Sequence, residues 1–475
     1  MSPRVRALGY GRSITMNDIK RLLAAAAAVT LVGAATSCES GKTSEDSIEE
    51  ITYATQPATK DASEIRGQKV VWLADYDLRA ADGTRPTALA LFEDVYGAKV
   101  EFVRAEPEEK YEKLDSMVLS GDEVDMFPYE EGALPDGVSR KRFDSLDPYR
   151  DILGLDEDGL WDDIKGVINT LVYDGGLYVV PYDVSDPQVL IYSRNIISEQ
   201  ELGDDPYQLY LDGKWDWDAF MKLMEAYVEK DSKHYGVCGD LGRGLLLSTG
   251  SSVVSYGSSG FVNNIADPKL EKAGQLMEEI VSKKLYCTEW KGSFPADKSS
   301  LFFAGGSWAL PASNASNPNS GLMAVPFPKA PGESEYHIGC DLEAKMLVKN
   351  STKGAAVATY IKCERTAASR EDYKKAAKEL ALAEEERADG RRNPFMTEEQ
   401  YDAVESYKAM FRKSPAIDIA YGMGSRMYGS GDYTYETRGV MDNLTGAILS
   451  GEVGSWSELC DKWSEVVDAE VANYN

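Results

Sequence analysis

The chain has 475 residues, and 51 lysines and arginines stand against 79 aspartates and glutamates, for a formal net charge of -28. A surface this acidic repels nucleic acid and anionic lipid, so we expect no nucleic-acid partner. Only two histidines occur, which disfavours histidine-based metal sites and a Ser-His-Asp triad, and we expect neither a bound metal nor a cofactor.

The N-terminal region has the layout of a secretory signal. Lys20 and Arg21 precede an uncharged run over 22–37, which is too short and too rich in alanine to span a bilayer comfortably. Cys38 follows directly after two small residues. This arrangement resembles a lipoprotein signal, in which the cysteine becomes the first residue and is acylated, for example with palmitate.

Residues 1–37 are therefore predicted to be a signal peptide of lipoprotein type, with the protein lipid-anchored on the extracellular face of the cell membrane. Ala35 departs from the pattern, which prefers leucine there, and ordinary cleavage nearby would release a soluble protein instead. Met16 also begins a sensible signal, so either Met1 or Met16 can be the start.

A polar segment over 38–65 follows the signal. It is rich in serine, threonine and acids, buries too little apolar surface to fold, and is predicted to be a disordered tether. About 410 residues remain, which is more than one typical domain needs and suits two sizeable lobes.

The first part of the folded region alternates between strands and helices. We predict strands over 69–74, 98–105 and 124–131, with helices over 87–97 and from Pro107 onward. This order implies a parallel sheet covered by helices, and ligands gather at the carboxyl ends of such strands. Four polar or aromatic residues lie at those ends: Asp75, Tyr76, Tyr129 and Glu130.

The middle of the chain continues the mixed pattern. A tight turn at 174–176 is predicted between apolar arms, followed by a strand over 189–192 and capped helices over 214–229 and 266–281. The segment 300–310 is predicted as strand–glycine–strand, 321–332 as a strand leading to a proline-broken linker, and 340–363 as a strand followed by a helix.

The tail from Arg370 is predicted to be mostly helical. Thr397 with Gln400, and Ser455 with Glu458, fit the capping box. Five cysteines lie beyond the signal, and scattered free thiols are expected, although the sequence leaves a Cys238–Cys287 disulfide open; the five are Cys238, Cys287, Cys340, Cys363 and Cys460.

Taken together, several segments resemble the extracellular solute-binding proteins of bacterial ABC importers, family 1, in the sugar-binding branch related to maltodextrin-binding proteins. After the lipoprotein signal and tether they are VVWLADYD, GLYVVPYDVSDPQVLIYSRNII, KWDWDAFMKLM, LFFAGGSWAL, GLMAVPFPKAPG and the C-terminal GSWSELCDKWSEVVDAEVANYN. No single segment is very specific, but their order and spacing cover essentially the whole mature chain.

The resemblance implies an α/β, two-lobe periplasmic-binding-protein-like fold with a multi-stranded hinge and a ligand cleft between the lobes. The chain would cross near 183–187, return near 325–328 and cross again near 370–380. Lobe one would then comprise 66–185 plus 325–375, and lobe two 186–324 plus 376–475. The stretch 371–412 departs from shorter family members as an added helical element.

Sugar binding needs an aromatic platform and planar acceptors such as carboxylates. Trp308 corresponds to the stacking tryptophan of the family, Tyr182 and Asp183 lie at the implied hinge, and the strand ends named above should face the cleft. The full predicted ligand-binding set is Trp308, Tyr182, Asp183, Tyr76, Asp75, Tyr129, Glu130, Asp341, Asn263 and Tyr421. Each of these side chains could instead be core or loop packing.

The implied function is a monomeric, non-enzymatic lipoprotein that captures a small solute, with a sugar or oligosaccharide favoured, and delivers it to the transmembrane subunits of an ABC permease. A peptide or polyamine is the alternative ligand. A secreted glycoside hydrolase needs two suitably spaced carboxylates that no local motif singles out. A surface receptor without transport is the remaining alternative.

Overall fold

The computed structural model describes residues 64–80, 83–156, 159–258, 260–386, 392–429 and 438–475. The predicted signal peptide, Cys38 and nearly all of the tether lie outside these ranges. Within the described ranges, no helix combines the length and the apolarity needed to cross a bilayer.

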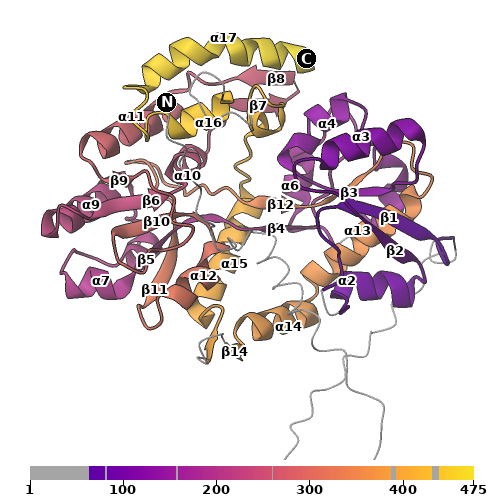
Figure 1. Cartoon of the computed structure of the whole chain (residues 1–475), viewed down its shortest axis with the longest axis horizontal. Helices are drawn as coiled ribbons and strands as arrows, with labels where there is room; N and C mark the ends of the chain where they lie inside the picture. Colours follow the sequence, from indigo (N-terminus) through magenta and orange to yellow (C-terminus); the bar gives the residue numbers. More distant parts are fainter. Residues whose placement is uncertain (1–63, 81–82, 157–158, 259, 387–391, 430–437) are drawn as a thin grey trace, which may run out of the picture.

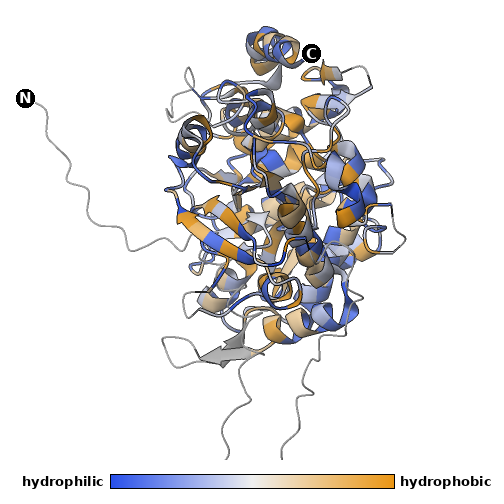
Figure 2. Cartoon of the chain, turned by 90° about the vertical axis from the view of Figure 1, so that its right-hand side faces the viewer, coloured by the Kyte–Doolittle hydropathy of each residue, from blue (hydrophilic) through white to orange (hydrophobic). Residues whose placement is uncertain are grey.

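Two α/β bodies lie side by side, joined through strands β4 and β12 (Figure 1). Lobe one is built on a four-stranded sheet in the order β13-β3-β1-β2, and lobe two on a five-stranded sheet in the order β11-β5-β10-β6-β9. Figure 2 shows hydrophilic and hydrophobic residues intermixed along the helices, as expected where one helix face packs on a sheet.

The sheet of lobe one is the parallel sheet predicted from the sequence. β1 pairs in parallel with β2 and with β3, and β13 joins antiparallel at β3. Its strands are β1 (Lys69–Ala74), β2 (Lys99–Arg104), β3 (Met126–Pro128) and β13 (Lys345–Leu347). The five residues 70–74 of β1 are all buried, as expected for a strand covered on both faces.

The helices of lobe one cover both faces and the ends of this sheet. They are α2 (Thr87–Ala90), η3 (Leu91–Val95), α3 (Lys110–Ser120), η4 (Glu131–Ala133), α4 (Asp136–Ser139), η5 (Asp147–Tyr149), α5 (Arg150–Leu153), α6 (Lys165–Thr170), α13 (Gly354–Ser369) and α14 (Glu371–Ala381). Long α13 packs on α2 and α5, which brings a segment from far along the chain back to the N-terminal sheet.

Lobe two has a mixed sheet at its centre. Its strands are β5 (Gln188–Ser193), β6 (Tyr235–Gly239), β9 (Tyr286–Cys287), β10 (Ser300–Gly306) and β11 (Leu322–Pro326), and a separate hairpin is formed by β7 (Val254–Gly257) and β8 (Gly260–Asn263). All seven residues of β10 are buried. Cys238 and Cys287 are register neighbours on β6 and β9, yet all five described cysteines are free thiols.

The remaining helices surround this second sheet. They are α7 (Arg194–Glu199), α8 (Pro206–Leu211), α9 (Trp217–Lys230), α10 (Leu241–Ser248), α11 (Pro268–Ser282), α12 (Ala309–Ser316), α15 (Glu398–Lys413), η6 (Ile419–Gly422), α16 (Val440–Gly446) and α17 (Trp456–Tyr474). Asp216 and Asp267 cap α9 and α11 as predicted, and Thr397 and Gln400 form the predicted capping box of α15.

The hinge consists of β4 (Asp183–Ser185) paired antiparallel with β12 (Asp341–Glu343), and a third connection runs from α14 through β14 (Glu384–Glu386) and β15 (Arg392–Pro394) to α15. The segment 326–339 still contacts lobe two, because Trp215 and Trp217 donate to the carbonyls of Pro326 and Pro328. These contacts favour a return to lobe one at β12 instead of the predicted 325–328. The exact lobe boundaries stay a prediction.

One local prediction is wrong and one is confirmed. The segment after β10 is the helix α12 and not a second strand, because a short apolar run has no periodicity that separates strand from helix. The tight turn at 174–176 is confirmed, because Tyr173 and Gly176 form an antiparallel bridge across it. The second arm bonds elsewhere, since Leu177 donates to Asp147 and accepts from Leu146.

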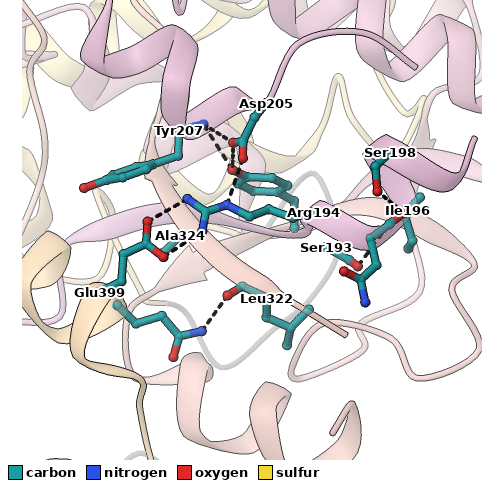
Figure 3. Close-up of polar contacts among 12 residues, drawn as sticks. Ser193, Arg194, Ile196, Ser198, Asp205, Tyr207, Leu322, Ala324 and Glu399 are labelled. Carbon is teal, nitrogen blue, oxygen red and sulfur yellow. Dashed lines mark hydrogen bonds and ion pairs between the residues drawn. The ribbon is translucent and has the colours of Figure 1, made fainter. Parts of the chain in front are cut away.

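Helix α15 is fastened to lobe two by a cluster of polar contacts (Figure 3). The guanidinium of Arg194 bonds both carboxylate oxygens of Glu399 at 2.6 and 2.8 Å and one oxygen of Asp205 at 2.8 Å. Gln400 donates to the carbonyl of Leu322 at 2.7 Å. The C-terminal part of the predicted helical insertion therefore packs on the edge strand β11 of lobe two.

Candidate functional site: a cavity between the lobes

A cavity of about 490 Å³ lies between the lobes, above the hinge strand β12. This volume is within the range of small-molecule sites, about 300–1,000 Å³. Both lobes and the hinge contribute to its wall, which consists of Asp75, Tyr76, Lys110, Pro128, Tyr129, Glu130, Glu131, Leu134, Gln188, Arg243, Leu247, residues 339–345, residues 416–419, Tyr421, Gly422 and Tyr428.

Lobe one contributes the carboxyl ends of its parallel strands. Asp75 and Tyr76 follow β1, and Tyr129 and Glu130 follow β3, so the sheet brings together two pairs that lie more than fifty residues apart in sequence. All four side chains line the cavity, where the parallel-sheet rule expects them.

Lys110 joins these two strand ends. It is the first residue of α3, only 7% exposed, and its ammonium contacts Asp75 at 3.2 Å and also pairs with Glu130. Burial by itself would lower the pKa of Lys110, but the neighbouring carboxylates outweigh burial and raise it above its ordinary value. The group is therefore a charged donor held between two acceptors.

Lobe two contributes Arg243 of α10 and a loop wall around η6. The guanidinium carbon of Arg243 lies 4.2 Å from the centre of the Tyr421 ring, and its Nη2 pairs with Glu131 of lobe one. Tyr428 packs edge-on against Tyr421 at 4.9 Å. This wall therefore combines aromatic faces with an arginine that spans the two lobes.

Asp418 fixes the position of η6. Its carboxylate accepts N–H bonds from Val253 at 2.6 Å, Val254 at 3.1 Å and Ala420 at 3.1 Å, and so it ties η6 to the start of β7. Burial raises the pKa of Asp418 to about 6, although these backbone hydrogen bonds act in the opposite direction.

The hinge side of the cavity is backed by Lys345 of β13. Its ammonium is buried under three aromatic rings, at 5.0 Å from Trp72, 6.0 Å from Tyr76 and 5.3 Å from Tyr182, and donates to the hydroxyl of Tyr182 at 3.0 Å. Tyr182 therefore lies behind Lys345 and does not line the cavity itself.

The structure brings six of the ten predicted site residues to the cavity wall: Asp75, Tyr76, Tyr129, Glu130, Asp341 and Tyr421. Four lie elsewhere. Besides Tyr182, Asp183 pairs with Arg412 on the hinge, and Asn263 donates to the carboxylate of Asp468 at 2.8 Å. Trp308 precedes α12 and is partly buried; the strand residue Gly306 beside it pairs with the cavity residue Gln188.

Sequence reasoning missed the cations Lys110, Arg243 and Lys345 as well as Glu131 and Asp418. Each sits at a helix start, on a helix face or on a short strand, where a charged residue is ordinary. Only Asp418 had a usable signal, because an aspartate before a short helix is a typical cap. In the described part of the chain, no group of three or more histidines, cysteines or carboxylates is placed to hold a metal ion.

Comparison with known proteins gives a family match and a structural match. Residues 87–380 match the model of the family described as bacterial extracellular solute-binding protein. No curated protein sequence matches the chain.

Many solved structures share the fold at low sequence identity. A cyclic α-maltosyl-1,6-maltose binding protein from Arthrobacter globiformis aligns with a TM-score of 0.58 and 14% identity over 86% of this chain and 100% of its own. The galacto-N-biose/lacto-N-biose I-binding protein of the ABC transporter of Bifidobacterium longum aligns with a TM-score of 0.57 and 14% identity over 86% of this chain and 98% of its own. An ABC substrate-binding protein of Listeria monocytogenes, solved with cycloalternan, aligns with a TM-score of 0.55 and 13% identity over 86% of this chain and 98% of its own.

Proposed function

From its membership of the bacterial extracellular solute-binding protein family, to which this chain belongs, we propose that it captures a sugar or short oligosaccharide in the cavity between its lobes and delivers it to an ABC permease. The two-lobe fold with a hinge supports this role, because such a molecule can close around a solute and release it on opening.

The composition of the cavity wall carries the proposal. Charged donors and acceptors alternate there, in the Asp75–Lys110–Glu130 triad and the Glu131–Arg243 pair, and tyrosines lie beside them. Sugar hydroxyls both donate and accept, so they suit such paired groups, and their C–H faces pack on aromatic rings. The wall holds six carboxylates against three cations, which disfavours an anionic ligand.

The ligands of proteins with similar structures also favour a sugar or oligosaccharide as the ligand. The three proteins described above are named for, or solved with, oligosaccharides. Of the four predicted contacts that do not line the cavity wall, which are Trp308, Tyr182, Asp183 and Asn263, we keep Trp308 as a proposed ligand contact. Trp308 lies close to the cavity, because its strand neighbour Gly306 pairs with the cavity residue Gln188.

We further propose that the protein works at the outer face of the cell membrane as a monomer. The signal layout ending at Cys38 supports acylation there, and two or more acyl chains anchor firmly because each buried CH₂ contributes about 0.8 kcal/mol. Mass spectrometry of the membrane fraction tests this: an acylated N-terminal Cys38 is expected, and an unmodified mature chain in the medium would contradict it.

A thermal-shift screen against a carbohydrate library tests the ligand class. A sugar present at about 100 times its dissociation constant should stabilise the protein by about 2.7 kcal/mol. Spermidine and a short peptide pool form the comparison arms, because the acidic cavity could also accept an amine. Stabilisation by spermidine and by no sugar would reject the sugar proposal.

We propose that the protein does not alter its ligand. Incubation with each stabilising oligosaccharide, followed by product analysis, should return the ligand intact. Release of shorter sugars would instead identify a hydrolase that uses a pair of the cavity carboxylates.

A further inference from the structure

The lobes also touch outside the cavity, along a line of contacts that we call the outer seam. It comprises three residues of lobe one and three of lobe two: Asp136, Tyr173 and Asp174, and Tyr256, Phe261 and Tyr474. The residues that line the cavity include none of these six, so a ligand held in the cavity does not touch them. In Figure 1 the elements β7, β8 and α17 of lobe two face α4 and α6 of lobe one here.

Aromatic rings form the centre of the outer seam. The ring of Tyr173 in lobe one lies 5.6 Å from that of Tyr256 and 5.7 Å from that of Phe261, both in lobe two. Tyr256 and Phe261 pack on each other at 4.5 Å, and Phe261 contacts Tyr474 at 5.9 Å. Lobe one therefore places one tyrosine against an aromatic cluster of lobe two.

Two hydrogen bonds cross the outer seam. The backbone N–H of Asp174 donates to the hydroxyl of Tyr256 at 2.9 Å, and the hydroxyl of Tyr474 donates to the carboxylate of Asp136 at 2.9 Å. Asn475 holds the lobe-two side in place, because its side-chain amide both accepts from and donates to the backbone of Phe261. The C-terminus of the chain is thus part of the contact between lobes.

At the wall of the cavity, the backbones of the two lobes meet at Gly422. A Cβ atom added at this glycine would overlap the carbonyl oxygen of Leu134 and lie 2.6 Å from that of Glu131, both in lobe one. Only a residue without a side chain permits this approach. The backbones of the two lobes are therefore in direct contact in the described conformation, and Gly422 is one of the residues that allow it.

We infer that the outer seam is a latch that sets the balance between open and closed forms of the protein. Rotation of the lobes about β4 and β12 separates residues that face each other across the seam, so its contacts stabilise the closed form alone. A group that favours one of two states shifts their populations whether or not it touches ligand. The latch therefore raises affinity for every ligand that the cavity accepts, by the same factor.

The first test removes the two crossing hydrogen bonds and keeps the rings, in the double variant Y256F/Y474F. Small-angle X-ray scattering of the ligand-free protein is expected to show a larger radius of gyration than for the wild type. The matched control is Y286F, because Tyr286 donates its hydroxyl to the carbonyl of Gly239 within lobe two. This control should scatter like the wild type.

The second test is a wedge. Gly422→Ala should separate the lobes at the cavity wall and open the ligand-free protein at least as far as the double variant. Gly454→Ala is the control, since an added Cβ there has no atom within 4 Å. Melting temperatures of all variants in the absence of ligand check that each lobe remains folded.

The affinity arm rests on the proposed function and uses a sugar identified in the thermal-shift screen. Calorimetry should show about tenfold weaker binding for Y256F/Y474F, with the rank order of sugars unchanged. Unchanged scattering of Y256F/Y474F would overturn the latch, whatever the wedge shows, because the wedge acts on the cavity wall and not on the seam. Because scattering needs no ligand, this result is independent of whether any sugar binds.

Discussion

Lobe one presents the cavity with the ends of two parallel strands, whereas lobe two presents it with the helix α10 and the loop around η6. In lobe one the sheet fixes the spacing of Asp75 and Glu130, and Lys110 fills the gap between them. In lobe two the positions of Arg243 and Tyr421 depend on contacts made by neighbouring elements, such as the bonds of Asp418.

This difference between the lobes indicates that the lobe-one wall of the cavity is rigid and the lobe-two wall is adaptable. The hydrogen bonds between the strands of a buried sheet hold side chains at the strand ends in place, so this wall should move little when a ligand binds. A wall built on a helix face and a loop can shift with the closing movement, and its arginine pairs across the lobes with Glu131. We expect lobe one to determine whether a ligand binds and lobe two to adjust how tightly.

The substitution Lys110→Met is expected to have the largest effect and tests the role of lobe one in ligand binding. This change removes the shared cation of Asp75 and Glu130, and with it a charged donor to the ligand, from a largely buried position; breaking such a pair also lowers folding stability by about 3–5 kcal/mol. We expect the calorimetric affinity for sugar to fall at least 100-fold. Lys99→Met, at an exposed position of β2, is the control. If Lys110→Met binds sugar as tightly as the wild type, the triad Asp75–Lys110–Glu130 does not contribute to ligand binding.

Trp308→Ala tests whether lobe two adds a stacking platform at the rim. Loss of a sugar–indole contact is expected to cost about 2–3 kcal/mol, which would abolish the thermal shift seen at about 100 times the dissociation constant. Trp290→Ala, an exposed tryptophan of the same lobe, should keep the full shift. A full shift in Trp308→Ala would confine the ligand to the cavity described above.

Arg243→Met probes the adaptable wall. It removes the pair with Glu131 and the contact with the Tyr421 ring, but the sheet of lobe one is untouched. We expect a loss of about tenfold in affinity, smaller than for Lys110→Met, measured by the same calorimetry. A larger loss than in Lys110→Met would reverse the proposed roles of the two lobes.

Asp418→Asn gives a pH-dependent readout of the loop wall. With its pKa raised to about 6, Asp418 keeps its proton in the folded protein over a range where the unfolded chain, near its ordinary value of 3.8, has released it. Stability therefore falls as pH rises from about 4 to 6, by about 2–3 kcal/mol from this group.

The asparagine variant lacks that titration. The melting temperature of the wild type minus that of Asp418→Asn should therefore decrease as pH rises through this window and level off above pH 6. A difference that stays constant from pH 4 to 7 would show that burial of Asp418 is not coupled to its proton.

The smallest effect is expected for Glu399→Gln, which weakens the contact that fastens α15 to lobe two in Figure 3. Partly exposed ion pairs contribute about 1 kcal/mol or less, so denaturant unfolding should shift only slightly. Sugar affinity should not change, because Glu399 lies outside the cavity wall. Glu465→Gln, at an exposed position of α17, serves as the control.

The sequence predicted lobe one's part of the site well. An apolar strand followed by Asp75 and Tyr76, and a second one followed by Tyr129 and Glu130, sufficed to place four side chains on one sheet edge. The reason is local, since strand–helix–strand order constrains the sheet to be parallel and its carboxyl ends to coincide.

The contribution of lobe two to the site was harder to predict from the sequence. Asn263 donates to Asp468 and does not line the cavity, and the segment containing Trp308 is the start of a helix. Arg243 and Gly422 gave no pattern in the sequence, because their importance comes from residues of the other lobe, more than one hundred positions away.

By itself, the sequence determined the class of fold, the alternation of strands and helices in lobe one, the helix caps at Asp216, Asp267 and Thr397, and the candidate edge of the first sheet. The tertiary structure alone decided which cations complete the cavity, that the chain pairs β12 with β4, and that the lobes meet along the outer seam. Caps and strand periods depend on neighbours within a few residues, whereas charge pairing and lobe contact depend on side chains that only folding brings within a few ångströms of one another.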